Sequence, residues 1–213
     1  MARDYKKCIV LKDKGGEPTG IIVLPKAKML YPAFFEPSLP KGEKDQTKAK
    51  YGCTLLMPKD ADLTPLKELV AKAITEKWGA KAKEMKIKKP FIKVTPEDEP
   101  KTVARLEAAG IEPSDFPVMV RIAGNYKPVV KGPDATSEIK DEEQVYEGRW
   151  ACVSINVYGW EHPTGGKGVS IGLQNVQLLD NDDVIPRGGS STSGDEFEAV
   201  EGGAAGTASV FDE

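Results

Sequence analysis

Residues 146–160 read Tyr-Glu-Gly-Arg-Trp-Ala-Cys-Val-Ser-Ile-Asn-Val-Tyr-Gly-Trp, and apolar and polar side chains alternate along them. A period of two is typical of a half-buried β-strand. Residues 162–168, His-Pro-Thr-Gly-Gly-Lys-Gly, supply turn-forming residues, and residues 169–179, Val-Ser-Ile-Gly-Leu-Gln-Asn-Val-Gln-Leu-Leu, return as a second strand. This part of the chain therefore predicts a long β-hairpin.

The two faces of the first strand carry different chemistry, because successive side chains point to opposite sides. The face expected in the core is small and β-branched: Ala151, Val153, Ile155 and Val157. The opposite face mixes aromatic rings with polar groups: Trp150, Cys152, Ser154, Asn156, Tyr158 and Trp160. Such a row of rings is suited to stacking unpaired bases, at roughly 1–3 kcal/mol per base. The alternative is that a further layer covers these rings, because aromatic residues in strands are often core residues.

The chain has 213 residues, 39% hydrophobic and 30% charged, which suits one water-folded domain with or without a tail. Cys8, Cys53 and Cys152 lie in apolar runs without paired spacing, which predicts buried thiols in a reducing compartment. No apolar run approaches the length of a membrane span, and no signal peptide opens the chain. We therefore expect a cytoplasmic protein that makes no membrane contact.

Charge is distributed unevenly along the chain. The net charge is −3, but the part from Asp180 onward holds nine acidic residues and one basic residue, Arg187, and so carries −8. The preceding 179 residues therefore carry +5, because −3 minus −8 leaves +5. A basic body with an acidic end favours a polyanionic partner more than the overall charge suggests.

The composition also changes after Ile185, where Gly, Ser and acidic residues replace the apolar runs. Such a segment cannot bury enough apolar surface to offset the entropy of ordering it. We therefore predict a folded domain over residues 1–185 and a disordered acidic tail over residues 186–213. The tail ends Ser-Val-Phe-Asp-Glu, with one aromatic residue just before two acids.

Other alternating runs predict further strands, at residues 9–11, 20–31, 51–57, 116–123 and 126–131. One clear helix is expected from Thr64, which can cap it, to Trp78, and a shorter helix over residues 101–109. These elements predict a mainly β fold: a closed or partly open, five-to-six-stranded antiparallel barrel of the oligonucleotide/oligosaccharide-binding (OB) type, with one or two helices and long basic loops. An open β-sandwich is the alternative.

Several kinds of catalytic chemistry lack their usual residues. The only histidine is His162, in a turn, and there is no Cys/His cluster for zinc and no phosphate-binding Gly-Lys-Ser/Thr loop. The carboxylates of Asp98, Glu99, Glu142 and Glu143 show no spacing that suggests acid–base work. We expect a protein without enzymatic activity, metal or cofactor. A metal-dependent nuclease built from scattered acidic residues remains an alternative.

Three blocks of sequence resemble a family of tailed-phage proteins that was long catalogued as a domain of unknown function. They are residues 26–37 (Lys-Ala-Lys-Met-Leu-Tyr-Pro-Ala-Phe-Phe-Glu-Pro), residues 50–59 (Lys-Tyr-Gly-Cys-Thr-Leu-Leu-Met-Pro-Lys) and the hairpin quoted above. The family is related to phage single-stranded-DNA-binding proteins with an OB barrel, and the similarity covers roughly residues 5–185. The resemblance implies a replication and recombination protein that coats unpaired DNA in the cytoplasm of a bacterial host.

The acidic tail is similar to tails that recruit replication partners in such proteins, with Phe211, Asp212 and Glu213 at the matching end. The DNA-contact residues are predicted from strand faces and charge. The phosphate-binding candidates are Lys26, Lys28, Lys50, Arg121, Lys127 and Lys167. The stacking candidates, some of which must be core residues, are Tyr31, Phe34, Phe35, Tyr51, Tyr126, Trp150, Tyr158 and Trp160.

The leading hypothesis is therefore a sequence-tolerant single-stranded-DNA-binding protein, present as a monomer or weak homodimer. A nuclease on the same substrate is one alternative. A structural virion protein, which would assemble through its β-edges and need no basic body, is the other.

Overall fold

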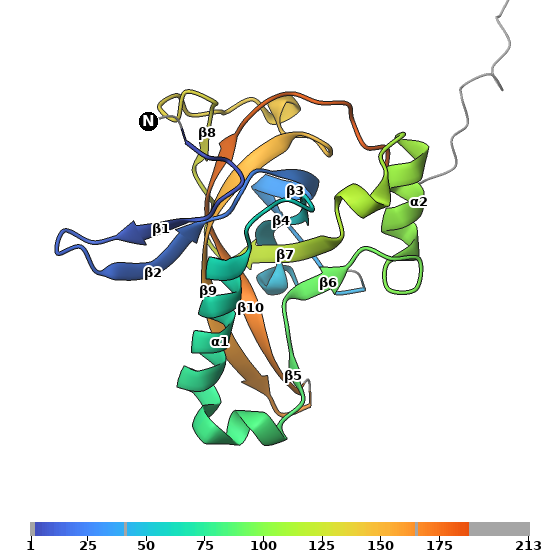
Figure 1. Ribbon diagram of the computed structural model, residues 1–213. Coiled ribbons are helices and arrows are strands. Elements are labelled where there is room, and N and C mark those ends of the chain that lie inside the picture. Colours follow the sequence, from blue (N-terminus) through green and yellow to red (C-terminus); the bar gives the residue numbers. More distant parts are fainter. Residues whose placement is uncertain (1–2, 41, 165, 188–213) are drawn as a thin grey trace, which may run out of the picture.

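The structure is a computed structural model that describes residues 3–40, 42–164 and 166–187 (Figure 1). Its strands are β1 (Ile9–Lys12), β2 (Pro18–Val23), β3 (Ala27–Ser38), β4 (Lys50–Met57), β5 (Ile87–Lys88), β6 (Phe91–Lys93), β7 (Val118–Gly124), β8 (Val130–Lys131), β9 (Trp150–His162) and β10 (Gly166–Leu178). Its helices are α1 (Thr64–Trp78) and α2 (Pro100–Ala108), with short 3₁₀ turns at Gln46–Lys48, Gly79–Glu84, Pro113–Asp115 and Glu142–Gln144. Within these residues, no helix is both long and apolar enough to cross a membrane.

Five strands close into a ring in the order β3, β4, β7, β10, β9 and back to β3. The pairing β7–β10 is parallel, and the other four neighbouring pairs are antiparallel. This ring confirms the predicted OB-type barrel. The parallel pair arises because β7 and β10 are distant in sequence and need no tight turn between them.

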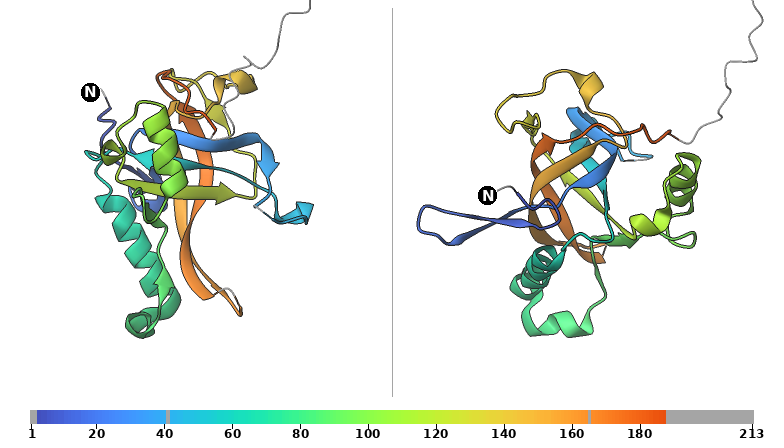
Figure 2. Two further views of the ribbon diagram at one scale, coloured as in Figure 1. Left: turned by 90° about the vertical axis from the view of Figure 1, so that its right-hand side faces the viewer. Right: turned by 45° about the horizontal axis from the view of Figure 1, so that its top comes forward.

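The hairpin predicted at residues 146–179 is present as β9 and β10. Its pairing runs from His162–Gly166 to Ala151–Leu178, with an irregularity between Leu173 and Asn175. Gly166, which follows the turn, has φ +85°, a conformation that favours glycine. The far end of the hairpin extends below the ring (Figure 2, left).

The interior of the ring is an apolar core to which each strand contributes. Met29, Leu55, Val120, Val153 and Ile171 are all almost completely buried there. Ala151, Val153 and Ile155 are fully buried and Val157 is partly buried, so the predicted inward face of β9 is confirmed.

Helix α1 covers the same face of the hairpin at its far end, and Figure 1 shows it alongside β9 and β10. A Cβ atom on Gly159 would lie 3.0 Å from Cβ of Lys77, so glycine permits the close approach. Trp78 is buried and its Nε1 donates to Glu161, 3.2 Å away. The N-terminal turn differs from prediction in one detail: Thr64 is the first helical residue, and the Asp62 carboxylate accepts its backbone N–H.

A second core lies on the outside of the ring, where α2 packs in front of the sheet (Figure 2, left). Leu30, Leu56 and Met119 point outward from β3, β4 and β7 and meet Val103 and Leu106 of α2. This helix therefore covers one part of the outer face and leaves the rest open.

The segment that follows β10 is fastened to α2 by buried charges. The Glu147 carboxylate is 4% exposed and accepts hydrogen bonds from the guanidinium groups of Arg105 and Arg187. Ile185 is buried in the second core, and the carbonyl of Pro186 accepts from Arg105 Nε at 2.8 Å. The described chain thus remains in contact with the domain up to residue 187. The tail predicted for residues 186–213 lies otherwise outside the described residues.

The three cysteines are free thiols. Burial raises the pKa of Cys53 to about 12, and it is likewise the main cause that raises the pKa of Cys152 to about 11. Both thiols therefore remain protonated near neutral pH, which makes them poor nucleophiles.

Candidate nucleic-acid interface

A row of small residues crosses the outside of the barrel from β3 to β10. Ala33 pairs with Gly52, Gly52 with Ala123, and Ala123 with Gly172. Directly paired residues project from the same face of a sheet, so these four form one continuous row, which Asn156 of β9 extends opposite Gly172. We call this row, from Ala33 to Asn156, the outer trough. Four strand spacings make it about 19 Å long, measured around the curved outside of the ring.

Close contacts explain why glycine occupies two of these positions. A Cβ atom on Gly52 would lie 2.2 Å from the carbonyl oxygen of Ile122, so a larger residue would collide with the β7 backbone. A Cβ atom on Gly172 would lie 2.1 Å from Oδ1 of Asn156, whose side chain crosses that position. Nε2 of Gln174 donates to the same oxygen at 3.3 Å, which holds the amide in place.

Two of the predicted stacking residues continue the face of Asn156 toward the end of the hairpin. Tyr158 is 43% exposed and lies opposite Ser170, and Trp160 lies opposite Gly168. A Cβ atom on Gly168 would lie 2.6 Å from the Trp160 ring, so the indole packs closely over this glycine. Because α1 covers the other face of the hairpin, these rings are turned away from it.

Basic residues share the outer face with the trough. Arg121 of β7 pairs with Thr54, and this pair is the next one along the same face from Gly52–Ala123. The Arg121 side chain is 64% exposed and contacts the Glu99 carboxylate at 3.0 Å. Lys50 begins β4 on the same face and is exposed. Lys88 of β5 is in register with Gly168, beside Trp160, and sequence reasoning did not select it.

The structure corrects part of the predicted contact set. Phe34 is 1% exposed and Tyr51 packs against the central core, because both point into the ring. Lys28 is 5% exposed and its Nζ contacts Asp182 at 2.9 Å. Neither Phe34 nor Lys28 is available to DNA in this conformation.

Trp150 is also engaged within the protein. Its Nε1 donates to Asp182 at 2.6 Å, and its ring lies 6.0 Å from that of Phe116 and 4.9 Å from Nζ of Lys26. Burial alone would raise the pKa of Asp182, but hydrogen bonds from Lys28, the Asp183 amide and Trp150 outweigh it and keep the pKa low. Trp150 therefore joins the barrel to the segment after β10.

Lys167 lies on the opposite face of the hairpin from Trp160. Its Nζ contacts Glu161 at 3.1 Å and Sδ of Met85 at 3.5 Å. Hydrogen bonds from Lys167 and Trp78 hold the pKa of Glu161 below its ordinary value. This lysine thus belongs to the α1 side, where it helps to attach the hairpin.

Three further predicted residues, Phe35, Tyr126 and Lys127, gather beyond the end of β7. Tyr126 is highly exposed, and Nζ of Lys127 lies 5.5 Å from the centre of the Phe35 ring. Phe35 and Lys127 line a hollow of about 320 Å³ that also contains Glu138 and Glu142. Its mixed charge makes this hollow a weaker phosphate site than the trough.

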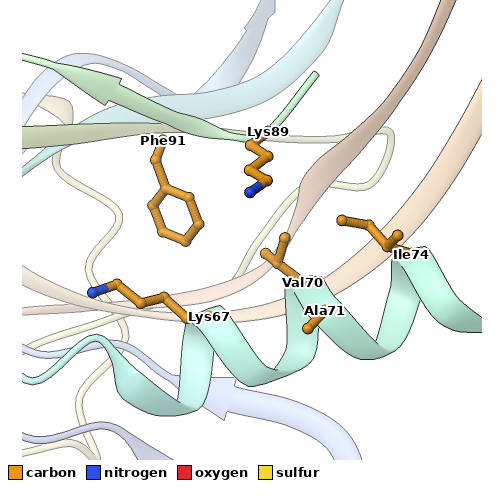
Figure 3. A pocket seen from close by; sticks show the side chains of 6 residues that line it. All are labelled: Lys67, Val70, Ala71, Ile74, Lys89 and Phe91. Atoms are coloured by element: carbon orange, nitrogen blue, oxygen red, sulfur yellow. The ribbon is translucent and has the colours of Figure 1, made fainter. Parts of the chain in front are cut away.

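A different hollow, of about 310 Å³, lies between α1 and β6 (Figure 3). Lys67 and Lys89 stand beside apolar walls formed by Val70, Ile74 and Phe91. Among residues 3–40, 42–164 and 166–187, no group of three or more His, Cys, Asp or Glu side chains could hold a metal ion.

The fold is similar to three solved structures of phage proteins. The single-stranded-DNA-binding protein of bacteriophage Enc34 in complex with ssDNA superposes with a TM-score of 0.58 at 20% identity, covering 79% of this chain and 90% of that one. A C-terminal truncation of the Enc34 protein has a TM-score of 0.61 at 21% identity, covering 86% and 95%. Bacteriophage T7 gp2.5, a single-stranded-DNA-binding protein, has a TM-score of 0.55 at 16% identity, covering 88% and 98%.

Among curated protein sequences, none matches this chain. A family model matches residues 21–206, which include the whole barrel from β3 to β10. By that match, the chain belongs to the family of the single-stranded-DNA-binding protein of Enterobacter phage Enc34.

Proposed function

We propose that this protein binds single-stranded DNA along the outer trough and coats it during phage DNA replication and recombination, in the cytoplasm of the bacterial host. The observation that carries this proposal is the continuous row of small residues, flanked at one end by the exposed Tyr158 ring and the partly exposed Trp160 ring, and along its side by Arg121 and Lys50. Membership of the Enc34 family supports it. The protein performs no chemistry on the DNA and acts as a monomer or weak homodimer.

The position of the trough agrees with how OB barrels bind oligonucleotides. Such barrels use the face of their second and third strands, between the loop joining strands 1 and 2 and the loop joining strands 4 and 5. Counted along the chain, the five ring strands are β3, β4, β7, β9 and β10, so the second and third strands are β4 and β7. The corresponding loops are the β3–β4 connection and the β9–β10 turn.

The chemistry of the trough favours binding without sequence preference. Tyr158 and Trp160 offer flat rings, and every base has a face that can stack on them. Arg121, Lys50 and Lys88 offer positive charge to phosphates, which are identical in every sequence. A length of about 19 Å holds a few nucleotides, at the lower end of the site sizes of OB folds.

Binding is expected to weaken steeply with salt, because each phosphate that a cation neutralises releases counterions. Arg121→Ala should weaken binding to all oligonucleotide sequences. It should also make the negative slope of log K against log salt less steep by about 1. The matched control is Lys72→Ala, on the exposed face of α1, which should leave the slope unchanged. Fluorescence-anisotropy titrations of labelled oligothymidine at several salt concentrations measure both.

The same titrations, run with single- and double-stranded oligonucleotides and with or without magnesium, test the function itself. Binding of the single strand without cleavage supports the proposal. Magnesium-dependent cleavage would instead indicate a nuclease, and a failure to bind any DNA would favour a structural virion protein.

We also propose that the acidic end of the chain competes with DNA and recruits replication or recombination proteins through Phe211, Asp212 and Glu213. Residues 195–213 include six acidic residues and neither lysine nor arginine. Deleting residues 188–213 is expected to tighten DNA binding at low salt, because it removes a tethered anion that seeks the same cations.

The gain should shrink as salt rises and screens the competition. A full-length variant with its tail acids changed to Asn and Gln separates charge from length, and should bind like the truncated chain. Equal or weaker binding by the truncated chain at low salt would contradict the competition.

A further inference from the structure

A third hollow, of about 430 Å³, adjoins the β3 end of the trough. It lies between α2, β3 and the segment that leaves the domain, and we call it the Tyr31 pocket. Its lining residues are Tyr31, Lys101, Ala104, Arg105, Ala108, Pro186 and Arg187. Tyr31 precedes Ala33, the first residue of the trough, by two positions in the same strand.

The charges around the Tyr31 pocket favour an anion. Three cationic residues line it: Lys101, Arg105 and Arg187. The Glu147 carboxylate contacts the two arginines. Lys101 makes no ion pair with any residue in the described ranges. The local balance is therefore about two positive charges, beside the apolar surface of Ala104, Ala108 and Pro186.

Two features of the pocket reduce the stability of the folded protein. Tyr31 has φ +51°, a left-handed conformation that is strained for a non-glycine residue. Arg105 is 6% exposed, and its Nη1 has no hydrogen-bond partner in the part of the chain described. Backbone strain of this kind clusters at binding sites, and an unsatisfied buried donor is rare enough in folded proteins to require an explanation.

A cation covers one face of the Tyr31 ring. The guanidinium carbon of Arg105 lies 4.9 Å from the ring centre, so the cation covers one face. The residue is nevertheless 50% exposed, so much of its surface remains accessible to a base. A strand bulge between Leu30 and Ala33 projects the ring out of the sheet.

We infer that the Tyr31 pocket binds one nucleotide of the single strand at the β3 end of the trough, and this inference rests on the proposed function. The base stacks on the open face of Tyr31, and its phosphate lies between Lys101 and Arg187. DNA bound in the trough then runs from the rings of Tyr158 and Trp160, past Ala123 and Gly52, to Tyr31. The strained residue marks the end of that path.

The decisive variant is Tyr31→Gly, because glycine tolerates the left-handed conformation while it removes the ring. The fold should remain intact, and single-stranded-DNA affinity should fall about 5- to 150-fold, the range for loss of one stacked base. Tyr31→Phe is the matched control, since it keeps the ring, and it should bind normally. Melting temperatures of both variants verify folding.

Two further measurements locate the phosphate and the base. Lys101→Ala should make the negative slope of log K against log salt less steep by about 1, whereas Lys72→Ala should leave that slope unchanged. Oligothymidine carrying 5-iodouracil should photo-crosslink to Tyr31 in the full-length protein, as read by mass spectrometry of the digested complex.

The outcomes separate this pocket from the trough and from the tail. Unchanged affinity of Tyr31→Gly, with crosslinks restricted to Tyr158 and Trp160, would overturn the pocket while the proposed function stands. Tighter binding by Tyr31→Gly would also overturn it. Absence of single-stranded-DNA binding by the unaltered protein would refute the proposed function itself.

Discussion

The double variant Tyr158→Ala, Trp160→Ala is expected to lose about 2–6 kcal/mol of single-stranded-DNA binding free energy, because two base–aromatic stacks contribute roughly 1–3 kcal/mol each. Both rings lie on the hairpin face turned away from α1, so their removal leaves the apolar contacts of the barrel in place. Anisotropy titration with oligothymidine measures the loss, and thermal melting reports the fold.

The control is the variant Tyr158→Phe, Trp160→Phe, which keeps two flat rings and should retain most of the affinity. The hypothesis would be wrong if the alanine variant melted far lower yet bound normally when folded. In that case the rings would serve the fold, and the small-residue trough would need another explanation.

The largest expected effect on stability comes from Glu147→Ala, which should lower the free energy of unfolding by about 3–5 kcal/mol. The change leaves the Arg105 guanidinium buried without its carboxylate, and an uncompensated buried charge is strongly destabilising. It also releases Arg187, whose side chain is mostly exposed and contributes little by itself. Urea unfolding followed by circular dichroism measures the difference.

Two companion variants make this test specific. Arg187→Ala should cost about 1 kcal/mol or less, since it removes an exposed partner. Arg105→Met combined with Glu147→Leu removes both buried charges, and should be clearly more stable than Glu147→Ala. If Glu147→Ala unfolded with the same free energy as the unaltered protein, the ion pairs would not fasten the segment after β10.

Part of the fold follows from local pattern alone. Alternation along residues 150–157 identified the inward face of β9, and helical spacing with a proline in the first turn identified α1 within one residue at each end. Both signals are local, because the positions concerned lie within one element. Five or six alternating strands, one clear helix between strand groups and long basic loops were enough to predict an OB-type barrel.

Adjacent residues in β3 show where local pattern fails. Phe34 and Phe35 both seemed available to bases, but bulges after Leu30 and Ala33 turn Phe34 into the core and leave Phe35 partly exposed. Tyr31 gave no signal of its left-handed backbone, because the residues that usually adopt it are glycine and asparagine. The burial of Arg105 against Glu147 leaves no local pattern, because the two residues lie 42 positions apart in the sequence.

The residues themselves establish a basic body with an acidic end, and they predict a barrel with a long hairpin that carries rings on its polar face. The trough depends on register between Ala33, Gly52, Ala123 and Gly172, which are far apart in sequence and unremarkable one by one. Closure of the ring, the parallel β7–β10 pair and the bulges of β3 set that register. Strand pairing is a long-range interaction that minimises the energy of the whole sheet, so tertiary structure alone decides which small residues align and which rings reach the surface.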